Sequence, residues 1–325
     1  MSGDVSPAIL DRDKHQTIVV TGGAGFIGSR VCEMLLAAGH EVRVIDSFTN
    51  YYDRAIKERN LSGFRDHANV RLYELDLATA DLSEPIEGAS VVLHLAAMPG
   101  LVRSWTDVAA YSHCNVVATA RILQAVSERA PAARFVQVST SSVYGLDATG
   151  DETATLQPAS PYGVTKLAAE HLVRAYQSQV GLDAIILRYF SVYGPRQRPD
   201  MAYNIFCSAL LDDREIHIFG DGGAIRSNTF VDDCARGTLQ AIAHAPTGSL
   251  YNLGGGVAIT VNEALAILGE VSGRTPKVIY KDARRGDQRV TIANFDKATR
   301  EIGYHPTIAP AEGLAKQWAW HQSLR

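Results

Sequence analysis

The sequence has few cysteines and no sign of a cysteine framework. Its 325 residues include four cysteines, with no CxxC pair and no regular spacing between them. This pattern argues against a disulfide scaffold and against a zinc site. We therefore expect free, buried thiols in a reduced, cytoplasmic protein that holds no metal. The four residues are Cys32, Cys114, Cys207 and Cys234.

The sequence also lacks long apolar runs and a surplus of positive charge. No run approaches the roughly 18–20 apolar residues that span a bilayer, and the N-terminal segment lacks the basic flank and apolar block of a secretory signal. Lys and Arg total 31 against 35 Asp and Glu, a net charge of −4. We therefore expect neither a membrane nor a nucleic acid as partner, and an anionic ligand would need a local cluster of cations.

Short β-branched apolar runs alternate with amphipathic stretches of helical period. This alternation is typical of an α/β protein whose parallel sheet is covered by helices on both faces. After Gly194 the sequence becomes rich in Gly, Pro and Arg, which predicts a smaller C-terminal α/β portion interleaved with the main sheet. A helix over 260–273 begins at a capping-box pair, Thr260 and Glu263. The predicted strands cover residues 17–21, 41–46, 70–76, 91–97, 134–140 and 183–190.

A glycine-rich turn stands between the first predicted strand and the first predicted helix. Gly22, Gly25 and Gly28 allow a tight turn, a close approach to a pyrophosphate and close packing of helix on strand. Asp46 ends the next strand, where it can accept both adenosine-ribose hydroxyls and would repel a 2′-phosphate. These features predict a Rossmann-type doubly wound sheet that binds NAD rather than NADP. Asp76 and Leu77 follow the third strand and are expected at the adenine, although Asp76 could instead only cap the next segment.

Tyr162 and Lys166 stand one helical turn apart in the segment SPYGVTK. A tyrosine with a pKa near 10 is a poor base at pH 7. A nearby ammonium and the positive nicotinamide ring would stabilise its phenolate and lower that pKa. The predicted strand that ends in VSTSS brings Thr140, Ser141 and Ser142 toward the same cleft, where one hydroxyl could bridge the tyrosine and a substrate hydroxyl.

The segments TGGAGFIGS, HLAA, STSSVYG, SPYGVTK and YGPRQRPDM resemble the extended short-chain dehydrogenase/reductase family, in its nucleotide-sugar epimerase and dehydratase branch. The resemblance runs from about Thr17 to near the C-terminus. It implies a tightly held NAD, Tyr162 as the catalytic acid and base, Lys166 on the nicotinamide ribose, and Thr140 or Ser141 as assisting hydroxyls. It also implies further contacts to NAD, from Phe26, Ile27, Asn50, Leu95, Ala96, Ala97, Ser139 and Tyr189.

The resemblance also divides the chain. It implies a flexible tail over 1–15, an NAD-binding domain over 16–190 to which residues of about 225–260 return, and a mainly nucleotide-sugar-binding domain over 191–325. Related enzymes commonly form homodimers through a four-helix bundle. Here that bundle would use the segment near 109–129 and the helix that bears Tyr162, although packing inside one chain explains their apolar positions equally well.

Two serines narrow the expected reaction. Dehydratases that resemble this sequence carry an Asp-Glu pair where Ser141 and Ser142 stand, and the related decarboxylases have a glutamate in this stretch. Serines cannot replace that acid and base at neutral pH. What remains is epimerisation, which needs one base and a hydride acceptor, and the resemblance is greatest to the 4-epimerases of UDP-glucuronate.

A UDP-hexuronic acid as substrate needs cations for its phosphates and its carboxylate. The resemblance implies Arg226 and Arg284 on the pyrophosphate, where an arginine fork binds bidentately, and Asp287 on the uridine ribose. It places Arg198, Ser191, Ser141 and Ser142 on the sugar carboxylate. Arg198 could instead simply pair with Asp200. Arg103 stands one place later than the arginine of related sequences, so its role as a substrate ligand is open.

Three alternative functions stay open at this point. A 4-epimerase of UDP-glucose or UDP-N-acetylglucosamine would differ in the sugar, and a UDP-glucuronate decarboxylase would release CO₂. A non-catalytic NAD-binding protein of the same fold would lack turnover altogether.

Overall fold

The computed structural model describes residues 15–283 and 288–325. Its centre is a sheet of seven strands whose neighbours are all parallel. From one edge to the other the strands are β12 (Leu250–Leu253), β7 (Ala184–Tyr189), β5 (Arg134–Thr140), β4 (Val91–His94), β1 (Thr17–Thr21), β2 (Glu41–Asp46) and β3 (Val70–Glu74). The chain order reverses between β1 and β4, as in a doubly wound sheet. The predicted fold class is confirmed.

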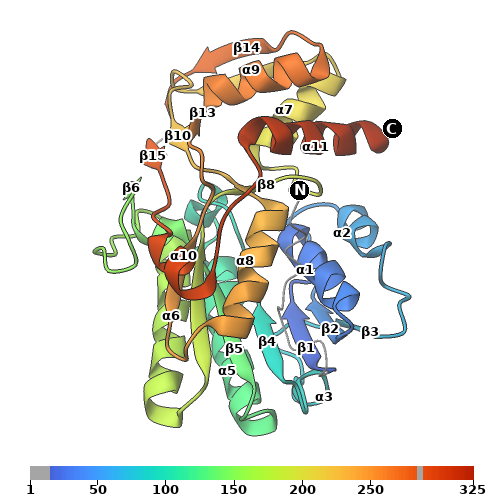
Figure 1. Cartoon of the computed structure of the whole chain (residues 1–325), viewed down its shortest axis with the longest axis vertical. Helices are drawn as coiled ribbons and strands as arrows, with labels where there is room; N and C mark the ends of the chain where they lie inside the picture. The colour runs from blue at the N-terminus through green and yellow to red at the C-terminus, as the bar shows by residue number, and fades with distance from the viewer. Residues whose placement is uncertain (1–14, 284–287) are drawn as a thin grey trace.

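Alternate side chains of each strand enter two separate cores. Ile18 and Val20 of β1 belong to the core under one face, and Val19 between them belongs to the core under the other. Because both faces are covered, the central strands β1 and β4 are buried along almost their whole length. Helices α1 (Phe26–Ala37) and α8 (Val231–His244) cover the first face, and α3 (Ser83–Ile86), α5 (Ala118–Arg129) and α6 (Pro161–Val180) cover the second (Figure 1).

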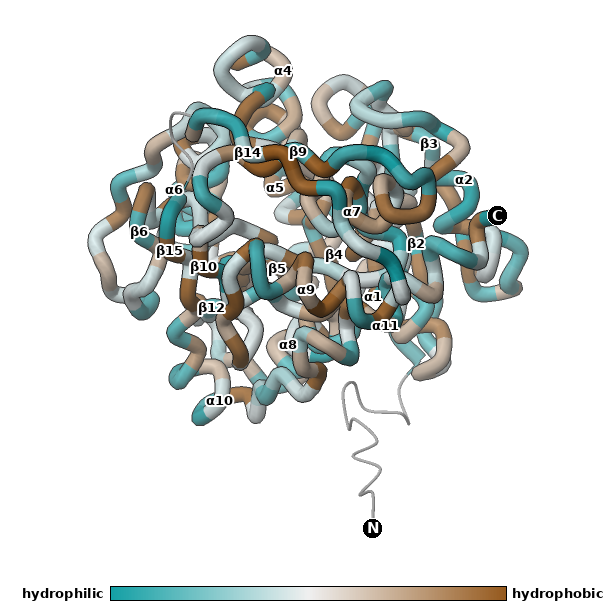
Figure 2. The backbone as a smooth tube through the Cα atoms, turned by 90° about the horizontal axis from the view of Figure 1, so that it is seen from above, coloured by the Kyte–Doolittle hydropathy of each residue, from teal (hydrophilic) through white to brown (hydrophobic). Residues whose placement is uncertain are grey.

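The later half of the chain forms a smaller layer beyond the carboxyl-terminal edge of the sheet (Figure 1). Its helices are α7 (Ala202–Leu211), α9 (Val261–Ser272) and α11 (Pro310–Ser323). Seen from above, β9 (Glu215–Phe219) and β14 (Lys277–Lys281) run side by side, with hydrophobic residues in both (Figure 2). The predicted capping box is present, because Thr260 and Glu263 bond each other at the start of α9.

The remaining elements are short. The helices are α2 (Arg54–Leu61), α4 (Val108–Ser112), α10 (Asp296–Ile302), η1 (Arg103–Trp105), η2 (His113–Val117) and η3 (Ser141–Val143). The strands are β6 (Asp147–Ala148), β8 (Val192–Tyr193), β10 (Ile225–Arg226), β11 (Thr229–Phe230), β13 (Ile259–Thr260) and β15 (Val290–Thr291).

Two elements from the second half of the chain pack against the first half. Strand β12 comes late in the sequence yet completes the sheet beside β7, and α8 packs against α1. The division into domains, with its return of residues near 225–260, stays a prediction. Within the described residues no helix is both long and apolar enough to cross a membrane. Cys32, Cys207 and Cys234 are buried, and Cys114 is half-buried; all four are free thiols.

Three predicted strands are shorter in the structure than the apolar runs suggested. Strand β3 ends at Glu74 rather than residue 76, β4 at His94 rather than residue 97, and β7 at Tyr189 rather than residue 190. The residues that follow β3 and β4 leave the ladder and line a cavity described below, among them Leu75 and Leu95. Their apolar character therefore serves the cavity wall rather than the sheet.

A buried ion pair joins α6 to the sheet. Arg188 of β7 donates from Nε and Nη2 to the two carboxylate oxygens of Glu170, at 3.0 and 2.8 Å. The side chains are only 3% and 5% exposed. Ser139 of β5 donates to the same carboxylate, and Tyr144 accepts from the remaining Nη1 of Arg188. Every charged atom of the pair thus has a partner, which is the condition under which a buried pair is tolerated.

Glu170→Ala should therefore be strongly destabilising, because it leaves the Arg188 guanidinium buried without its counter-ion. We expect the free energy of unfolding to fall by about 3–5 kcal/mol, measured by urea denaturation. Glu128→Ala is the matched control, since Glu128 is exposed and bonds only the side chain of Gln124 among the described residues. Equal losses in the two variants would contradict this account.

Candidate active site

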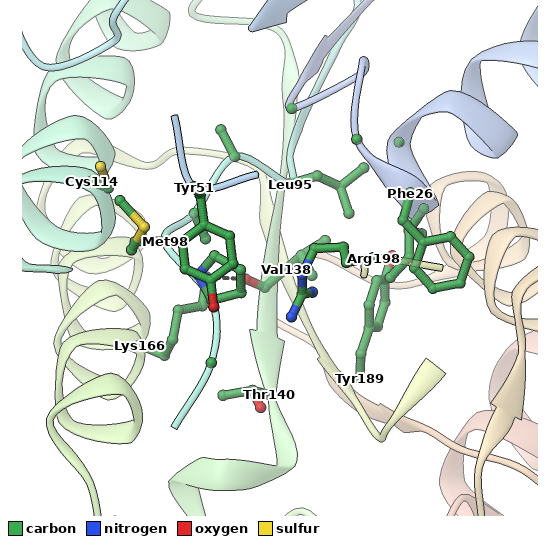
Figure 3. Close-up of a pocket in the computed structure, with 18 of the residues that line it drawn as sticks. Phe26, Tyr51, Leu95, Met98, Cys114, Val138, Thr140, Lys166, Tyr189 and Arg198 are labelled. Carbon is green, nitrogen blue, oxygen red and sulfur yellow. Dashed lines mark hydrogen bonds between the residues drawn. The ribbon is translucent and has the colours of Figure 1, made fainter. Parts of the chain in front are cut away.

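A cavity of about 440 Å³ lies where the carboxyl-terminal ends of the central strands meet the second half of the chain. Parallel strands place the ends of β1, β2, β4, β5 and β7 along one edge, and the chain reversal between β1 and β4 opens a crevice there. Most of the residues singled out from the sequence line this cavity. Figure 3 shows how side chains from several strands and loops converge on it.

The glycine turn forms one wall of the cavity. Gly22 has a φ of +71°, and a Cβ there would lie 2.9 Å from the backbone nitrogen of Ala96. A Cβ on Gly28 would collide with the carbonyl oxygen of Gly22. No side chain caps the start of α1 at Gly25, so the first amides of this helix are available to an anion, which the helix dipole also attracts. Phe26 and Ile27 line the cavity beside them.

Asp46 is buried at the end of β2 and is held through one oxygen. Its Oδ1 accepts from the backbone N–H of Phe48 at 2.9 Å and from Nζ of Lys57 at 2.7 Å. Among the described residues no hydrogen bond to Oδ2 is found, so one oxygen is anchored and the other faces no protein donor. This arrangement fits a carboxylate that accepts from two vicinal hydroxyls of a ribose.

Asp76 and Leu77, the residues expected at the adenine, line the cavity, and so do Leu95, Ala96 and Ala97. Asp76 also caps its own turn, since Oδ1 accepts from the N–H of Ala78, and its Oδ2 lies 3.2 Å from Nε2 of His113. The capping role of Asp76 is therefore present, and its contact with the adenine stays a prediction.

Tyr162 and Lys166 sit in the first two turns of α6, which begins at the capping residue Ser160. Lys166 donates from Nζ to the carbonyl oxygen of Val138 at 2.7 Å (Figure 3). Desolvation lowers the pKa of Lys166 to about 8, and the charge of Glu170 acts in the opposite direction. Tyr189 lines the cavity too, and its hydroxyl pairs with that of Thr238.

Burial raises the pKa of Tyr162, whereas its hydrogen bond with Thr140 and the charge of Arg198 lower it. The ammonium of Lys166 is directed to the Val138 carbonyl instead, so its expected effect on the tyrosine stays a prediction. The groups that favour the phenolate in this structure are a hydroxyl from β5 and a guanidinium from the loop after β8.

A row of hydroxyl groups lines the cavity beside Tyr162. The backbone N–H of Ser142 donates to Oγ1 of Thr140 at 3.2 Å, and the same oxygen lies 3.2 Å from Oγ of Ser142. Ser139, Ser141 and Ser191 line the cavity as well. The row offers several small donors to a polar ligand and, in these positions, no carboxylate that could act as a second acid or base.

Two arginines from the second half reach the cavity. Arg198 pairs bidentately with Asp200, from Nε to Oδ1 and from Nη2 to Oδ2, both at 3.0 Å. The pairing left open by the sequence is therefore present, although Arg198 also lines the cavity. Arg226 lines it and donates to the backbone carbonyls of Ile225 and Gln288. Arg284 and Asp287 lie outside the described residues.

Two of the expected site residues do not line the cavity. Asn50 is exposed in the turn after β2, and Arg103 stacks on the ring of Tyr51, 5.0 Å from its centroid. The cavity wall also contains residues that were not singled out from the sequence. Among them are Tyr51 and Tyr52 in the loop after β2, Lys57 in α2, Met98 and Gln288. The available signal was the tyrosine pair five residues after the acidic strand end.

Known proteins resemble the chain over nearly its whole length. An uncharacterized UDP-glucose epimerase of Bacillus subtilis is 38% identical, over 94% of this chain and 98% of that one. A UDP-glucuronate 4-epimerase of Thermodesulfobacterium geofontis is 35% identical, over 93% and 95%. The crystal structure of a UDP-glucuronic acid 4-epimerase from Bacillus cereus, in complex with UDP-glucuronic acid and NAD, superimposes with a TM-score of 0.92. It is 36% identical, over 95% of this chain and all of that one.

The doubly wound sheet, the glycine cradle and the Tyr-Lys helix define an enzyme of the short-chain dehydrogenase/reductase class. More narrowly, residues 18–254 match the NAD dependent epimerase/dehydratase family, and the chain belongs to that family. The family resemblance noted in the sequence is confirmed.

Gly28→Ala should abolish retention of the dinucleotide, because the added methyl group collides with the Gly22 carbonyl and pushes the helix start away from the phosphates. We expect purified Gly28→Ala to carry no NAD after denaturation and extraction, whereas the parent protein does. The control is Gly63→Ala, where the nearest atom would be Oε1 of Glu33 at 3.5 Å. Full NAD content in Gly28→Ala would contradict the assignment of this wall.

Proposed function

We propose that the protein is an NAD-dependent UDP-glucuronate 4-epimerase, which interconverts UDP-glucuronate and UDP-galacturonate. The observation that carries the proposal is one cavity holding Tyr162, Thr140 and Arg198 beside serines where a dehydratase would need an acid and a base. The relative from Thermodesulfobacterium geofontis and the complex from Bacillus cereus support the same sugar.

NAD fits the residues that line the cavity. The cradle of Gly22 and Gly28 leaves space where a side chain would collide, and the free amides of α1 suit a pyrophosphate. The unpartnered Oδ2 of Asp46 suits the two ribose hydroxyls of NAD and disfavours an added phosphate. When bound, NAD supplies the hydride acceptor for C4 of the sugar and returns the hydride later.

Tyr162 is the acid and base of the proposed reaction. Its phenolate takes the proton of the C4 hydroxyl as the sugar is oxidised, and its phenol returns a proton when the 4-keto sugar is reduced on the other face. Thr140 lowers the pKa of the tyrosine, and its hydroxyl can bond both the tyrosine oxygen and the sugar hydroxyl during the reaction, which shortens the path of the proton. Between the two steps the keto sugar turns about its pyrophosphate tether.

The intermediate of this reaction is a β-keto acid, which loses CO₂ when the bond to its carboxylate aligns with the ketone. Arg198 and the hydroxyls of Ser141 and Ser191 line the cavity where they can hold that carboxylate. We infer that these donors keep the bond out of alignment while the sugar turns. Arg226 would hold the pyrophosphate, and Arg284 and Asp287, which lie outside the described residues, keep their predicted roles at the phosphates and the uridine ribose.

A UDP-glucose 4-epimerase is the second candidate. The Bacillus subtilis relative is named an uncharacterized UDP-glucose epimerase, and the pairing of Arg198 with Asp200 leaves less uncompensated positive charge for a sugar carboxylate. The two candidates differ in one group, the carboxylate at C5, so both substrates must be offered to the same preparation.

A homodimer is proposed as well. Large apolar side chains are exposed on the elements next to the cavity, with Trp105 at 61%, Val164 at 53% and Val117 at 44%. They lie on η1, α6 and η2, and a second copy that buried them would remove this apolar surface from water. The cytoplasmic location stays a prediction from the sequence.

Purified protein incubated with UDP-glucuronate should produce UDP-galacturonate, followed by proton NMR. Tyr162→Phe should reduce kcat by at least about 100-fold, the usual contribution of a general acid and base. Tyr280→Phe is the control, because Tyr280 is 54% exposed and remote from the cavity lining. Turnover of UDP-glucose alone would favour the second candidate, CO₂ release would indicate a decarboxylase, and an active Tyr162→Phe enzyme would contradict the mechanism.

Thr140→Val should move the pH dependence of the reaction upward. Thr140 lowers the pKa of Tyr162, and the base is the phenolate, so the variant needs a higher pH to reach the same ionised fraction. We expect the acidic limb of kcat/KM to shift to higher pH, because the variant loses a contact that favours the charged phenolate.

Thr247→Val is the control for this shift, since Thr247 is exposed and bonds Asp183 far from Tyr162. A shift of the Thr140→Val profile to lower pH, or none, would show that the threonine does not act on the ionisation of Tyr162.

A further inference from the structure

The guanidinium of Arg198 already holds a carboxylate. Asp200, two residues later in the same loop, takes up Nε and Nη2 in the side-on geometry that arginine uses for any carboxylate. Among the described residues no other hydrogen bond of this guanidinium is found. Arg198 is only 20% exposed and lines the cavity, whereas Asp200 is 37% exposed and is not among the described residues that line it.

A residue of a second loop holds Asp200 in this position. The hydroxyl of Tyr51, in the loop after β2, donates to Oδ2 of Asp200 at 3.2 Å. The Tyr51 ring lies between two guanidinium groups, 5.0 Å from that of Arg103 and 5.9 Å from that of Arg198. Figure 3 shows the Arg198 guanidinium directed toward Tyr51. Three loops that are distant in sequence thus meet around one ion pair.

The local charges balance without a ligand. Arg198 is paired with Asp200, and Arg103 lies 3.7 Å from the carboxylate of Asp107. A sugar carboxylate that binds Arg198 therefore adds a second negative charge next to Asp200. The two carboxylates either compete for the same guanidinium edge or repel each other across it, and like charges within a few ångströms disfavour binding.

We propose that Asp200 is a built-in competitor for the sugar carboxylate, so that it weakens the binding of UDP-hexuronic acids and sets the preference between acidic and neutral sugars. The inference rests on the proposed function, because it assumes that Arg198 meets the carboxylate of the substrate. With a neutral sugar the Arg198–Asp200 pair stays intact, and no buried cation is left without an anion.

The competition also bears on turnover. A guanidinium that could find no other anion would keep the sugar carboxylate bound after the ring has turned, whereas release of the product requires that carboxylate to leave. Asp200 offers Arg198 a partner whenever the carboxylate moves away, so the cation is never left unpaired in a partly buried place. Tyr51 keeps that partner within reach.

The test is Asp200→Asn, which keeps the shape of the side chain and removes its charge. Dissociation constants for UDP-glucuronate and UDP-glucose are measured by calorimetry on the NAD-loaded enzyme, in a Tyr162→Phe background that stops turnover. We expect Asp200→Asn to bind UDP-glucuronate about three- to tenfold more tightly, the size of a partly exposed charge interaction. Binding of UDP-glucose should be unchanged or weaker.

Asp212→Asn is the matched control. Asp212 also pairs with an arginine two residues away, Arg214, but it is not among the residues that line the cavity. Asp212→Asn should therefore leave the dissociation constants of both substrates unchanged. Tyr51→Phe supplies a second variant, since it frees Asp200 without changing any charge. Because Asp200 then competes less firmly, we expect a smaller gain in UDP-glucuronate affinity in the same direction.

Weaker binding of UDP-glucuronate by Asp200→Asn would overturn the inference and make Asp200 a residue that orients Arg198. Unchanged binding would overturn it too. Failure of the proposed function is a separate result, namely a parent enzyme that binds and converts UDP-glucose but not UDP-glucuronate. If such a parent enzyme gains UDP-glucuronate binding through Asp200→Asn, Asp200 is still identified as the competitor. If Asp200→Asn gains no UDP-glucuronate binding either, both proposals are overturned.

Discussion

The docking of helix α6 on the end of strand β5 is the contact on which the candidate site depends. The Lys166 ammonium bonds the Val138 carbonyl, and Ser139 bonds Glu170 one turn further along the helix. Glu170 is in turn paired with Arg188 of the neighbouring strand β7. These buried polar contacts fix the rotation of α6, so that Tyr162 in its first turn lies beside Thr140. A helix rotated by one residue would lose both the charge partners and the hydrogen bond to the tyrosine.

Both ends of the cavity use the same electrostatic arrangement. At the proposed dinucleotide end Asp46 is paired with Lys57, and at the proposed sugar end Arg198 is paired with Asp200. In each pair the residue that lines the cavity keeps its charge, and a neighbour of opposite sign compensates part of it. A buried or half-buried charge is thereby stabilised in the free protein. An anionic or hydroxyl-bearing ligand then meets a prepared partner rather than an isolated ion.

The local features of this site could be predicted from the sequence, whereas its long-range pairs could not. The glycine turn, Asp46 and the Tyr162–Lys166 pair each follow from spacing within one strand, turn or helix. The bond between Tyr51 and Asp200 joins residues 149 apart in sequence, and nothing in either segment specifies the other. Strand ends were overestimated at Glu74 and His94 because an apolar run continues from the sheet into the cavity wall. Lys57 was missed because a lysine on a charged helix resembles a solvated one.

The late position of strand β12 has a consequence for how the chain matures. Strand β7 is synthesised well before β12, and between them the chain must first produce α7, β9 and α8. Until β12 emerges, the outer edge of β7 offers unpaired N–H and C=O groups along a strand that is fully buried in the finished fold, which is a template for wrong pairing. A nascent chain arrested before residue 250 would therefore be a natural client for a chaperone, even with its glycine turn and Tyr-Lys helix complete.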